Sequence, residues 1–134
     1  MSDQLVCRLF VYGTLMPGRL RWPFLEPFAA GHRSAAARGL IFDSGRGWPV
    51  AVLEGPDVAS GDEHDVVPGY VVDLDARRID AALVILDDVE DTATDTLRRV
   101  VVTTTAGEHA WAYHFTQATT GLRRIDRWQA QSDR

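Results

Sequence analysis

Residues 6–15 read VCRLFVYGTL, and this stretch decides how the rest of the chain is interpreted. Its apolar and β-branched side chains from Val6 to Tyr12 alternate between two faces, which predicts a strand. The regular pattern stops at Gly13, a residue that can adopt backbone angles closed to other residues, so the chain can turn sharply there. Such a loop either only turns the chain or presents its backbone N–H groups to an anion.

The composition is that of one soluble globular domain. The chain has 134 residues, of which 46% are hydrophobic and 25% charged. We therefore expect a single domain over residues 1–134, with a frayed C-terminal tail from about residue 129. The net charge of −5 argues against a nucleic-acid partner, since phosphate binding needs a basic face. All 14 basic residues are Arg, so Schiff-base chemistry by Lys is excluded.

Three further features predict a cytoplasmic protein that does not enter a membrane. Cys7 is the only cysteine, so no intramolecular disulfide can form, which is typical of a reducing compartment. The N-terminal residues do not have the pattern of a secretory signal. No stretch approaches the roughly 18 consecutive apolar residues of a membrane-spanning helix.

The chain alternates strand signals with turns and contains one clear helix. Asp75 is a good N-cap for a helix from Ala76 to about Glu90, and residues 19–28 predict an irregular segment or a short helix. Residues 54–65 read as a surface loop, and Gly39 as a bulge or a point of close backbone approach. Strands are predicted at residues 35–43, 50–53, 66–74, 97–104 and 109–115. A mostly antiparallel, curved or closed sheet with the helix packed on it is the simplest arrangement.

One acidic residue of this helix lies where an apolar residue is expected. At ~100° per residue, Glu90 continues the apolar stripe of Ile79, Leu83 and Leu86. By the same count Asp87 and the other acids of the helix fall on its flank and solvent side. A buried carboxylate has a raised pKa and can act as a general base near neutral pH. Two alternatives remain: Glu90 lies at a frayed helix end, or it pairs with Arg98 or Arg99.

Other chemistries find little support in the residue pattern. The sequence has no GxSxG elbow and no phosphate-binding P-loop. Its four histidines, His32, His64, His109 and His114, lack the spacing of a metal site, so we expect core or surface roles for them. Trp48, Trp111 and Tyr113 are read either as core residues or as the wall of a ligand site.

Several short motifs, taken together, resemble the γ-glutamylcyclotransferase-like family, and in particular its γ-glutamylamine cyclotransferase-like proteins. The match covers roughly residues 5–128, with the order and spacing of the motifs kept. The motifs are YGTL at 12–15, GRGWPVA at 45–51, PGYV at 68–71, LDDVE at 86–90, an Arg-containing strand at 99–102 and AWAY at 110–113.

This resemblance implies a fold, a reaction and a set of site residues. The fold would be α+β: a small mixed, mostly antiparallel β-barrel with flanking helices. The reaction would cyclise a γ-glutamyl group to 5-oxoproline and release an amine, without a metal or an organic cofactor. Glu90 would be the catalytic acid/base, and the partner a small γ-glutamyl substrate. The implied substrate-binding residues are Tyr12, Gly13, Thr14, Leu15, Trp48 and Tyr113.

Two positions depart from the family pattern. Asp91 stands where the family usually has Gly after the glutamate, and Leu97 stands where it usually has Tyr. The first adds a negative charge beside the expected base, and the second removes a hydroxyl. An alternative function therefore stays open: a non-catalytic module on the same fold that binds a small carboxylate or serves in an interaction. The sequence leaves the released amine and the oligomeric state open.

Overall fold

The structure is a computed structural model that describes residues 6–53, 65–90 and 96–128. The predicted loop at 54–65, apart from Asp65, and the predicted tail from residue 129 lie outside these residues. In chain order the elements are β1 (Arg8–Val11), α1 (Trp22–Leu25), η1 (Glu26–Phe28), β2 (Ala29–Asp43), β3 (Pro49–Leu53), β4 (Val66–Leu74), η2 (Ala76–Arg78), α2 (Ile79–Val89), β5 (Leu97–Thr103), β6 (His109–Phe115) and β7 (Arg123–Ile125).

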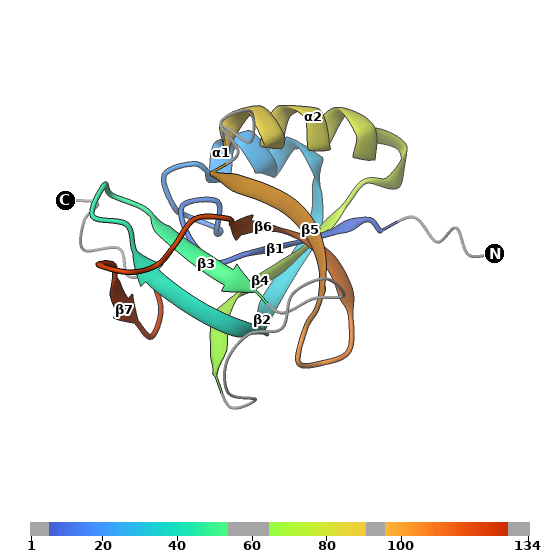
Figure 1. The fold of residues 1–134 in the computed structure, drawn as a ribbon. Coiled ribbons are helices and arrows are strands. Elements are labelled where there is room, and N and C mark those ends of the chain that lie inside the picture. Colours follow the sequence, from blue (N-terminus) through green and yellow to red (C-terminus); the bar gives the residue numbers. More distant parts are fainter. Residues whose placement is uncertain (1–5, 54–64, 91–95, 129–134) are drawn as a thin grey trace.

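The strands form one mixed sheet that nearly closes into a barrel. The strand order is β3-β2-β4-β1-β6-β5, with β7 paired to β2. The β1–β6 pairing, at Leu9 and Trp111, is parallel, whereas the other described pairings are antiparallel. A bridge between Ala37 and Thr104 brings β2 to the end of β5. Helices α1 and α2 lie side by side over the sheet (Figure 1). The predicted α+β barrel with flanking helices is confirmed.

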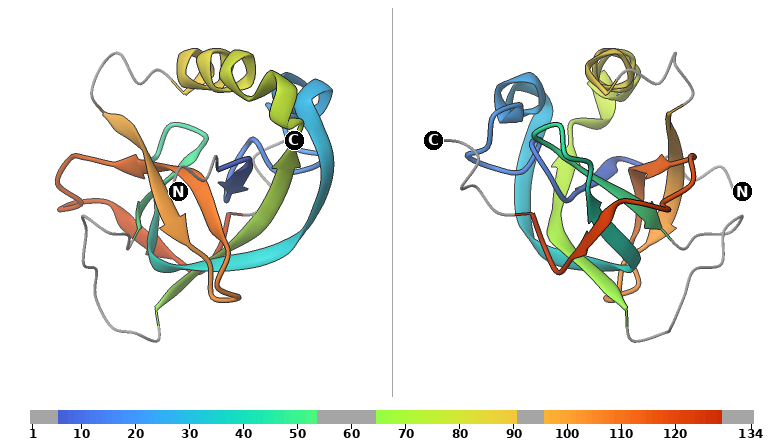
Figure 2. Two further views of the ribbon diagram at one scale, coloured as in Figure 1. Left: turned by 90° about the vertical axis from the view of Figure 1, so that its right-hand side faces the viewer. Right: turned by 60° about the vertical axis from the view of Figure 1, so that its left-hand side comes forward.

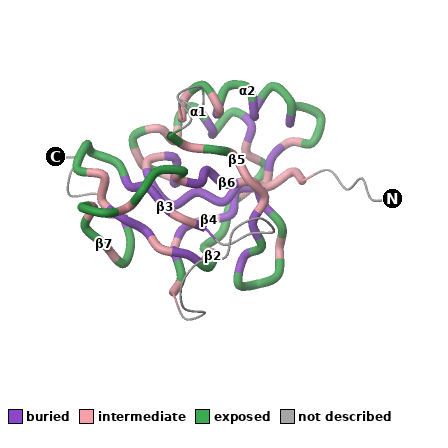
Figure 3. Tube along the Cα trace, viewed as in Figure 1, coloured by how far each residue is buried: buried purple, intermediate pink, exposed green. Residues whose placement is uncertain are grey.

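Strand β1 runs through the centre of the core. Leu9, Phe10 and Val11 are all buried, and β1 lies between β4 and β6 in the sheet. Figure 3 shows the buried segments gathered in the centre of the sheet, with exposed segments along the helices and turns. The side chains on both of the two predicted faces, Leu9 and Val11 on one and Phe10 on the other, are therefore buried. The consequence for the site is that the loop after β1 starts from a fixed point.

Strand β2 is longer than predicted, since it begins at Ala29 and not at residue 35. Residues 31–34 read GHRS, a sequence without a strand pattern, and they become part of the strand by pairing with β4. Figure 2 shows β2 curving around the barrel; its last residues, from Gly39, pair with β3. Gly39 has φ +152° and lies so close to β3 that a Cβ would be 2.4 Å from the Val52 carbonyl oxygen. The predicted close approach at Gly39 is confirmed.

The predicted long helix consists of two parts. Asp75 caps the short turn η2 by accepting a hydrogen bond from the Arg77 N–H at 3.0 Å. The α-helix proper, α2, begins at Ile79 and ends at Val89, with Ile79, Leu83 and Leu86 buried on the sheet side. None of the helices in the described part of the chain has the length and apolarity needed to cross a bilayer.

The C-terminal region adds a short strand that the sequence pattern did not predict. Strand β7 pairs with the end of β2, and two ion pairs hold it there: Arg123 with Asp43 and Arg124 with Asp65, both at 2.8 Å. Trp128, which follows β7, is buried. These contacts close the barrel wall on the side of the β2–β3 turn.

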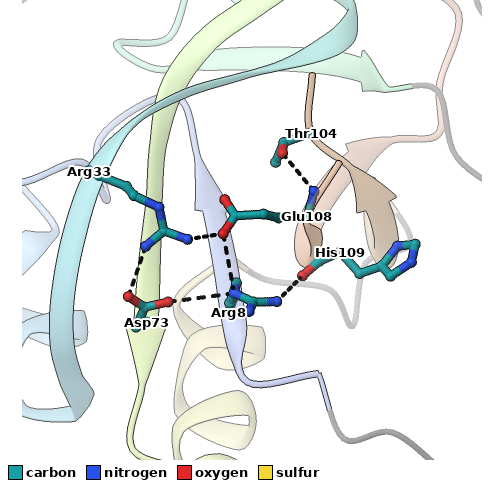
Figure 4. Close-up of polar contacts among 6 residues, drawn as sticks. All are labelled: Arg8, Arg33, Asp73, Thr104, Glu108 and His109. Carbon is teal, nitrogen blue, oxygen red and sulfur yellow. Dashed lines mark hydrogen bonds and ion pairs between the residues drawn. The ribbon is translucent and has the colours of Figure 1, made fainter. Parts of the chain in front are cut away.

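Four charged residues form a network on the outer face of the sheet (Figure 4). This sheet-face network consists of Arg8, Arg33, Asp73 and Glu108. Arg33 donates to Asp73 Oδ2 at 2.9 Å and also to Glu108 Oε2, while Arg8 Nε lies 3.6 Å from Asp73 Oδ1 and 3.8 Å from Glu108 Oε2. The network links β1, β2, β4 and the β5–β6 turn through partly exposed side chains.

Candidate active site

The loop after β1 and the end of α2 meet at one pocket of about 470 Å³. Gly13, Thr14 and Leu15 line it from one side, and Glu90 lines it from another. The structure thus brings the 12–15 loop and Glu90, which lie far apart in sequence, to the same pocket. Of the predicted substrate-binding residues, Tyr12, Trp48 and Tyr113 line the same pocket.

Local contacts fix the loop. The Tyr12 hydroxyl donates to the Tyr113 carbonyl oxygen at 2.7 Å, and the Met16 N–H donates to the Gly13 carbonyl at 3.0 Å. A Cβ at Gly13 would lie 2.7 Å from Pro49 Cγ, so only glycine fits against this proline without movement. Burial, and then the charge of Glu90, raise the pKa of the Tyr12 hydroxyl, which stays protonated as a donor.

Glu90 directly follows α2 and closes its C-terminal turn, with its N–H donating to Leu86 O at 2.9 Å. Its side chain is only 15% exposed and forms an ion pair with Arg21, with Nη1 to Oε2 at 3.1 Å. Burial raises the pKa of the Glu90 carboxyl, and the Arg21 guanidinium offsets part of that rise. The alternative that Glu90 pairs with Arg98 or Arg99 is wrong, because α1 and the preceding loop approach the end of α2 first.

Arg21 is a site residue that the sequence pattern did not reveal. Its backbone N–H donates to Thr14 O at 2.8 Å, and its Nη1 donates to Val89 O at 3.1 Å as well as to Glu90. Its guanidinium also lies over the Trp48 ring, 5.7 Å from the centroid. Arg21 thus ties the loop, the helix end and the aromatic wall together.

Asp87 lies in a different environment from the one that the sequence predicted. The helical projection put it on the flank and solvent side, yet it accepts a hydrogen bond from the Tyr113 hydroxyl at 2.8 Å and a bidentate pair from Arg99 at 2.8 and 3.2 Å. The sheet covers this flank, so the side chain is only partly exposed. Burial, and next the bond to Asp87, raise the pKa of Tyr113, which keeps its proton in the pocket.

The mouth of the pocket carries an exposed aromatic ring and a guanidinium. Trp48 is 37% exposed, and Arg46 lies two positions before it on the β2–β3 turn. Leu97 lines the pocket and makes that part of the wall aliphatic. Asp91, the other departure, lies outside the described residues.

The described histidines, His32, His109 and His114, do not line this pocket, and His64 lies outside the described residues. His114 is buried and accepts a hydrogen bond from the Leu53 N–H at 3.1 Å, and burial lowers its pKa. His32 packs edge-on against Trp22 and Tyr70. Within residues 6–53, 65–90 and 96–128, no group of three His, Cys, Asp or Glu side chains is arranged to hold a metal ion.

A family model described as gamma-glutamyl cyclotransferase, AIG2-like, matches residues 9–130 of the chain. The chain belongs to this family. The search of curated proteins found no match. The resemblance seen in the sequence motifs is thereby confirmed, and with it a cyclotransferase-like fold.

Solved structures similar to this family member agree with the fold. Uncharacterized protein PH0828 from Pyrococcus horikoshii is 23% identical, with a TM-score of 0.58 over 91% of this chain and 86% of that chain. Protein ytfP from Escherichia coli is 24% identical, with a TM-score of 0.57 over 95% and 99%. YkqA from Bacillus subtilis is 19% identical, with a TM-score of 0.62 over 92% of this chain but 40% of that one.

Proposed function

We propose that the protein is a γ-glutamyl cyclotransferase that converts the γ-glutamyl group of a small substrate to 5-oxoproline and releases an amine. The observation that carries this proposal is the buried carboxylate of Glu90, which lines the same pocket as the glycine loop at residues 12–15. Membership of the cyclotransferase family supports it. We further propose that residues 1–134 act as a single cytoplasmic domain.

Glu90 acts as general base and then as general acid. It takes a proton from the substrate α-ammonium, and the free amine attacks the γ-carbonyl carbon to form the ring C–N bond. As the ring nitrogen becomes an amide it gives up a second proton, and the leaving nitrogen gains a proton through Glu90 while its C–N bond breaks. The remaining proton passes to the released amine. The raised pKa of Glu90 suits this exchange, which contributes roughly 10²–10⁴-fold to the rate.

The loop and the aromatic residues hold the substrate in the folded conformation that cyclisation needs. The N–H groups of residues 13–15 bind the head group or the developing oxyanion. Tyr113 and Trp48 form the walls beside the scissile bond. Because both reacting groups belong to one molecule, keeping them in contact supplies much of the rate advantage. The proposed mechanism uses no cofactor.

The test is 5-oxoproline release from a panel of γ-glutamyl amines and γ-glutamyl amino acids. We expect the wild-type protein to release 5-oxoproline from at least one member and Glu90→Gln to lose that activity. No release from the panel would contradict the proposal, and equal release by the variant would remove Glu90 from the mechanism.

A second candidate function is binding of a small carboxylate without turnover. The aliphatic Leu97 in the pocket wall favours it, because a hydroxyl expected from the family pattern is missing there. In that case the wild-type protein binds γ-glutamyl compounds in calorimetry and releases no 5-oxoproline from them.

A further inference from the structure

The pocket already holds one positive and one negative side chain in contact. Glu90 is the one acid among its described lining residues, and Arg21 Nη1 lies 3.1 Å from its Oε2. A γ-glutamyl head group carries the same two charges, an α-ammonium and an α-carboxylate on one carbon. The charges of Arg21 and Glu90 are therefore complementary to the carboxylate and the ammonium of the head group.

Arg21 has donors to spare for this task. Both side-chain hydrogen bonds described for it use Nη1. A guanidinium has five N–H donors in a planar fork, which leaves those of Nε and Nη2 for a carboxylate. The side chain is 31% exposed, so it reaches the pocket space while it stays partly shielded from water.

Arg21 is also held in place before any ligand arrives. Its N–H bond to Thr14, its bond to Val89 O and its position over Trp48 fix the guanidinium beside the loop. The other pocket guanidinium, that of Arg46, lies on an exposed turn at the mouth. A preorganised receptor binds more tightly, since less side-chain freedom is lost on binding. This difference favours Arg21 over Arg46 as the carboxylate receptor.

We propose that Arg21 binds the α-carboxylate of the substrate while Glu90 receives the α-ammonium, so that this pair selects γ-glutamyl compounds over analogues without the α-carboxylate. The inference rests on the proposed function for its substrate, but it concerns recognition and not the chemical step. It makes Arg21 a specificity-determining residue. Binding of the α-ammonium to Glu90 also places the α-nitrogen next to the base that deprotonates it.

The test compares two ligands that differ only in the α-carboxylate: γ-glutamyl-ethylamide and 4-aminobutanoyl-ethylamide. Binding is measured by NMR titration to Glu90→Gln, in which turnover is suppressed. We expect γ-glutamyl-ethylamide to bind about 10- to 100-fold more tightly, as for a charge-assisted hydrogen bond. Adding Arg21→Gln should bring this ratio close to one, and adding Arg21→Lys should retain part of it.

Adding Arg46→Gln to the same background is the matched control, and it should leave the ratio unchanged. A ratio that survives Arg21→Gln, a ratio that disappears with Arg46→Gln, or no binding of γ-glutamyl-ethylamide overturns the inference. The dispersion of the amide spectrum shows whether each variant is folded. Failure of the proposed function is a separate result, because it is an absence of 5-oxoproline release by the wild-type protein.

Discussion

Two groups of Arg and carboxylate side chains in this molecule use the same chemistry in different surroundings. In the sheet-face network two guanidinium groups meet two carboxylates, and the side chains are 28–43% exposed. In the pocket a single pair, Arg21 and Glu90, has a carboxylate that is only 15% exposed. The network is richer in contacts, yet the pocket pair is where burial raises the pKa of a carboxyl.

This difference in exposure indicates that removal of water from a carboxylate, and not the number of charges around it, prepares the carboxylate for proton transfer. In the network each acid lies near two guanidinium groups and keeps contact with solvent. At Glu90 the loss of hydration outweighs the single guanidinium, which leaves the group closer to the pH at which it must both take and give a proton. The network raises the pKa of Arg33 instead, chiefly through its hydrogen bond to Glu108.

The largest expected effect is a difference in kcat between variants of Glu90, in the pocket, and Glu108, in the sheet-face network. Glu90→Gln should lower kcat by roughly 10²–10⁴-fold, because the variant cannot exchange a proton with either nitrogen. Glu108→Gln should leave kcat within about twofold, since its carboxylate only stabilises a partly exposed network. Both are measured by 5-oxoproline release under saturating substrate. Equal losses of kcat in the two variants would show that Glu90 has no catalytic role beyond that of a carboxylate in the network.

The next effect concerns the pH dependence of activity. Arg21 lowers the pKa of Glu90, so Arg21→Met should raise that pKa further and keep the base protonated at higher pH. The acid limb of the kcat/KM profile should therefore move to higher pH, in addition to any loss of rate. Arg33→Met, the counterpart from the network, should leave this limb in place. An acid limb that stays fixed in Arg21→Met would exclude Arg21 as the counter-ion of Glu90.

A smaller effect is expected in stability. The pKa of Glu90 is raised in the folded protein above its ordinary value of 4.5. The folded state therefore binds this proton more tightly, and that stabilisation is present below the unfolded pKa and lost as pH rises through the folded pKa. The Glu90→Gln variant lacks this titrating group and therefore does not lose this stabilisation. The urea midpoint of the variant minus that of the wild-type protein should therefore increase as the pH rises above 4.5. A difference that is constant with pH would contradict a buried, titrating Glu90.

The smallest effect belongs to the network. Asp73→Asn weakens contacts with Arg8 and Arg33 that are partly exposed, so the Tm should stay within about 4 °C of wild type. The remaining difference should shrink further in 0.5 M salt, where such pairs are screened. A larger, salt-independent fall in Tm would mean that the network is coupled to the core.

Much of the barrel could be predicted because its strands carry local signals. Alternating residues mark β5 and β6, and Gly39 marks the close approach to β3. The start of β2 could not be found, because its polar residues become a strand only through pairing with β4. Strand β7 is three residues long, too short for a periodic signal.

The site was predictable where a motif or a helical period pointed to it, as at the 12–15 loop and Glu90. Arg21 was not, since its contact with Glu90 joins residues 69 positions apart and its own segment has no period. Asp87 was misplaced for a related reason. A helical projection assigns its flank to solvent, whereas β5 and β6 bring Arg99 and Tyr113 to that flank.

The hydrogen bond from Tyr12 to Tyr113 has a consequence for folding kinetics. It joins residues 101 positions apart, beside the parallel pairing of β1 with β6. Contacts of such sequence separation form late and slowly, because a long loop must close before they add stability. We therefore expect the 12–15 loop to acquire its shape only when the barrel forms. A ligand that binds the pocket would then report the folded fraction of the barrel.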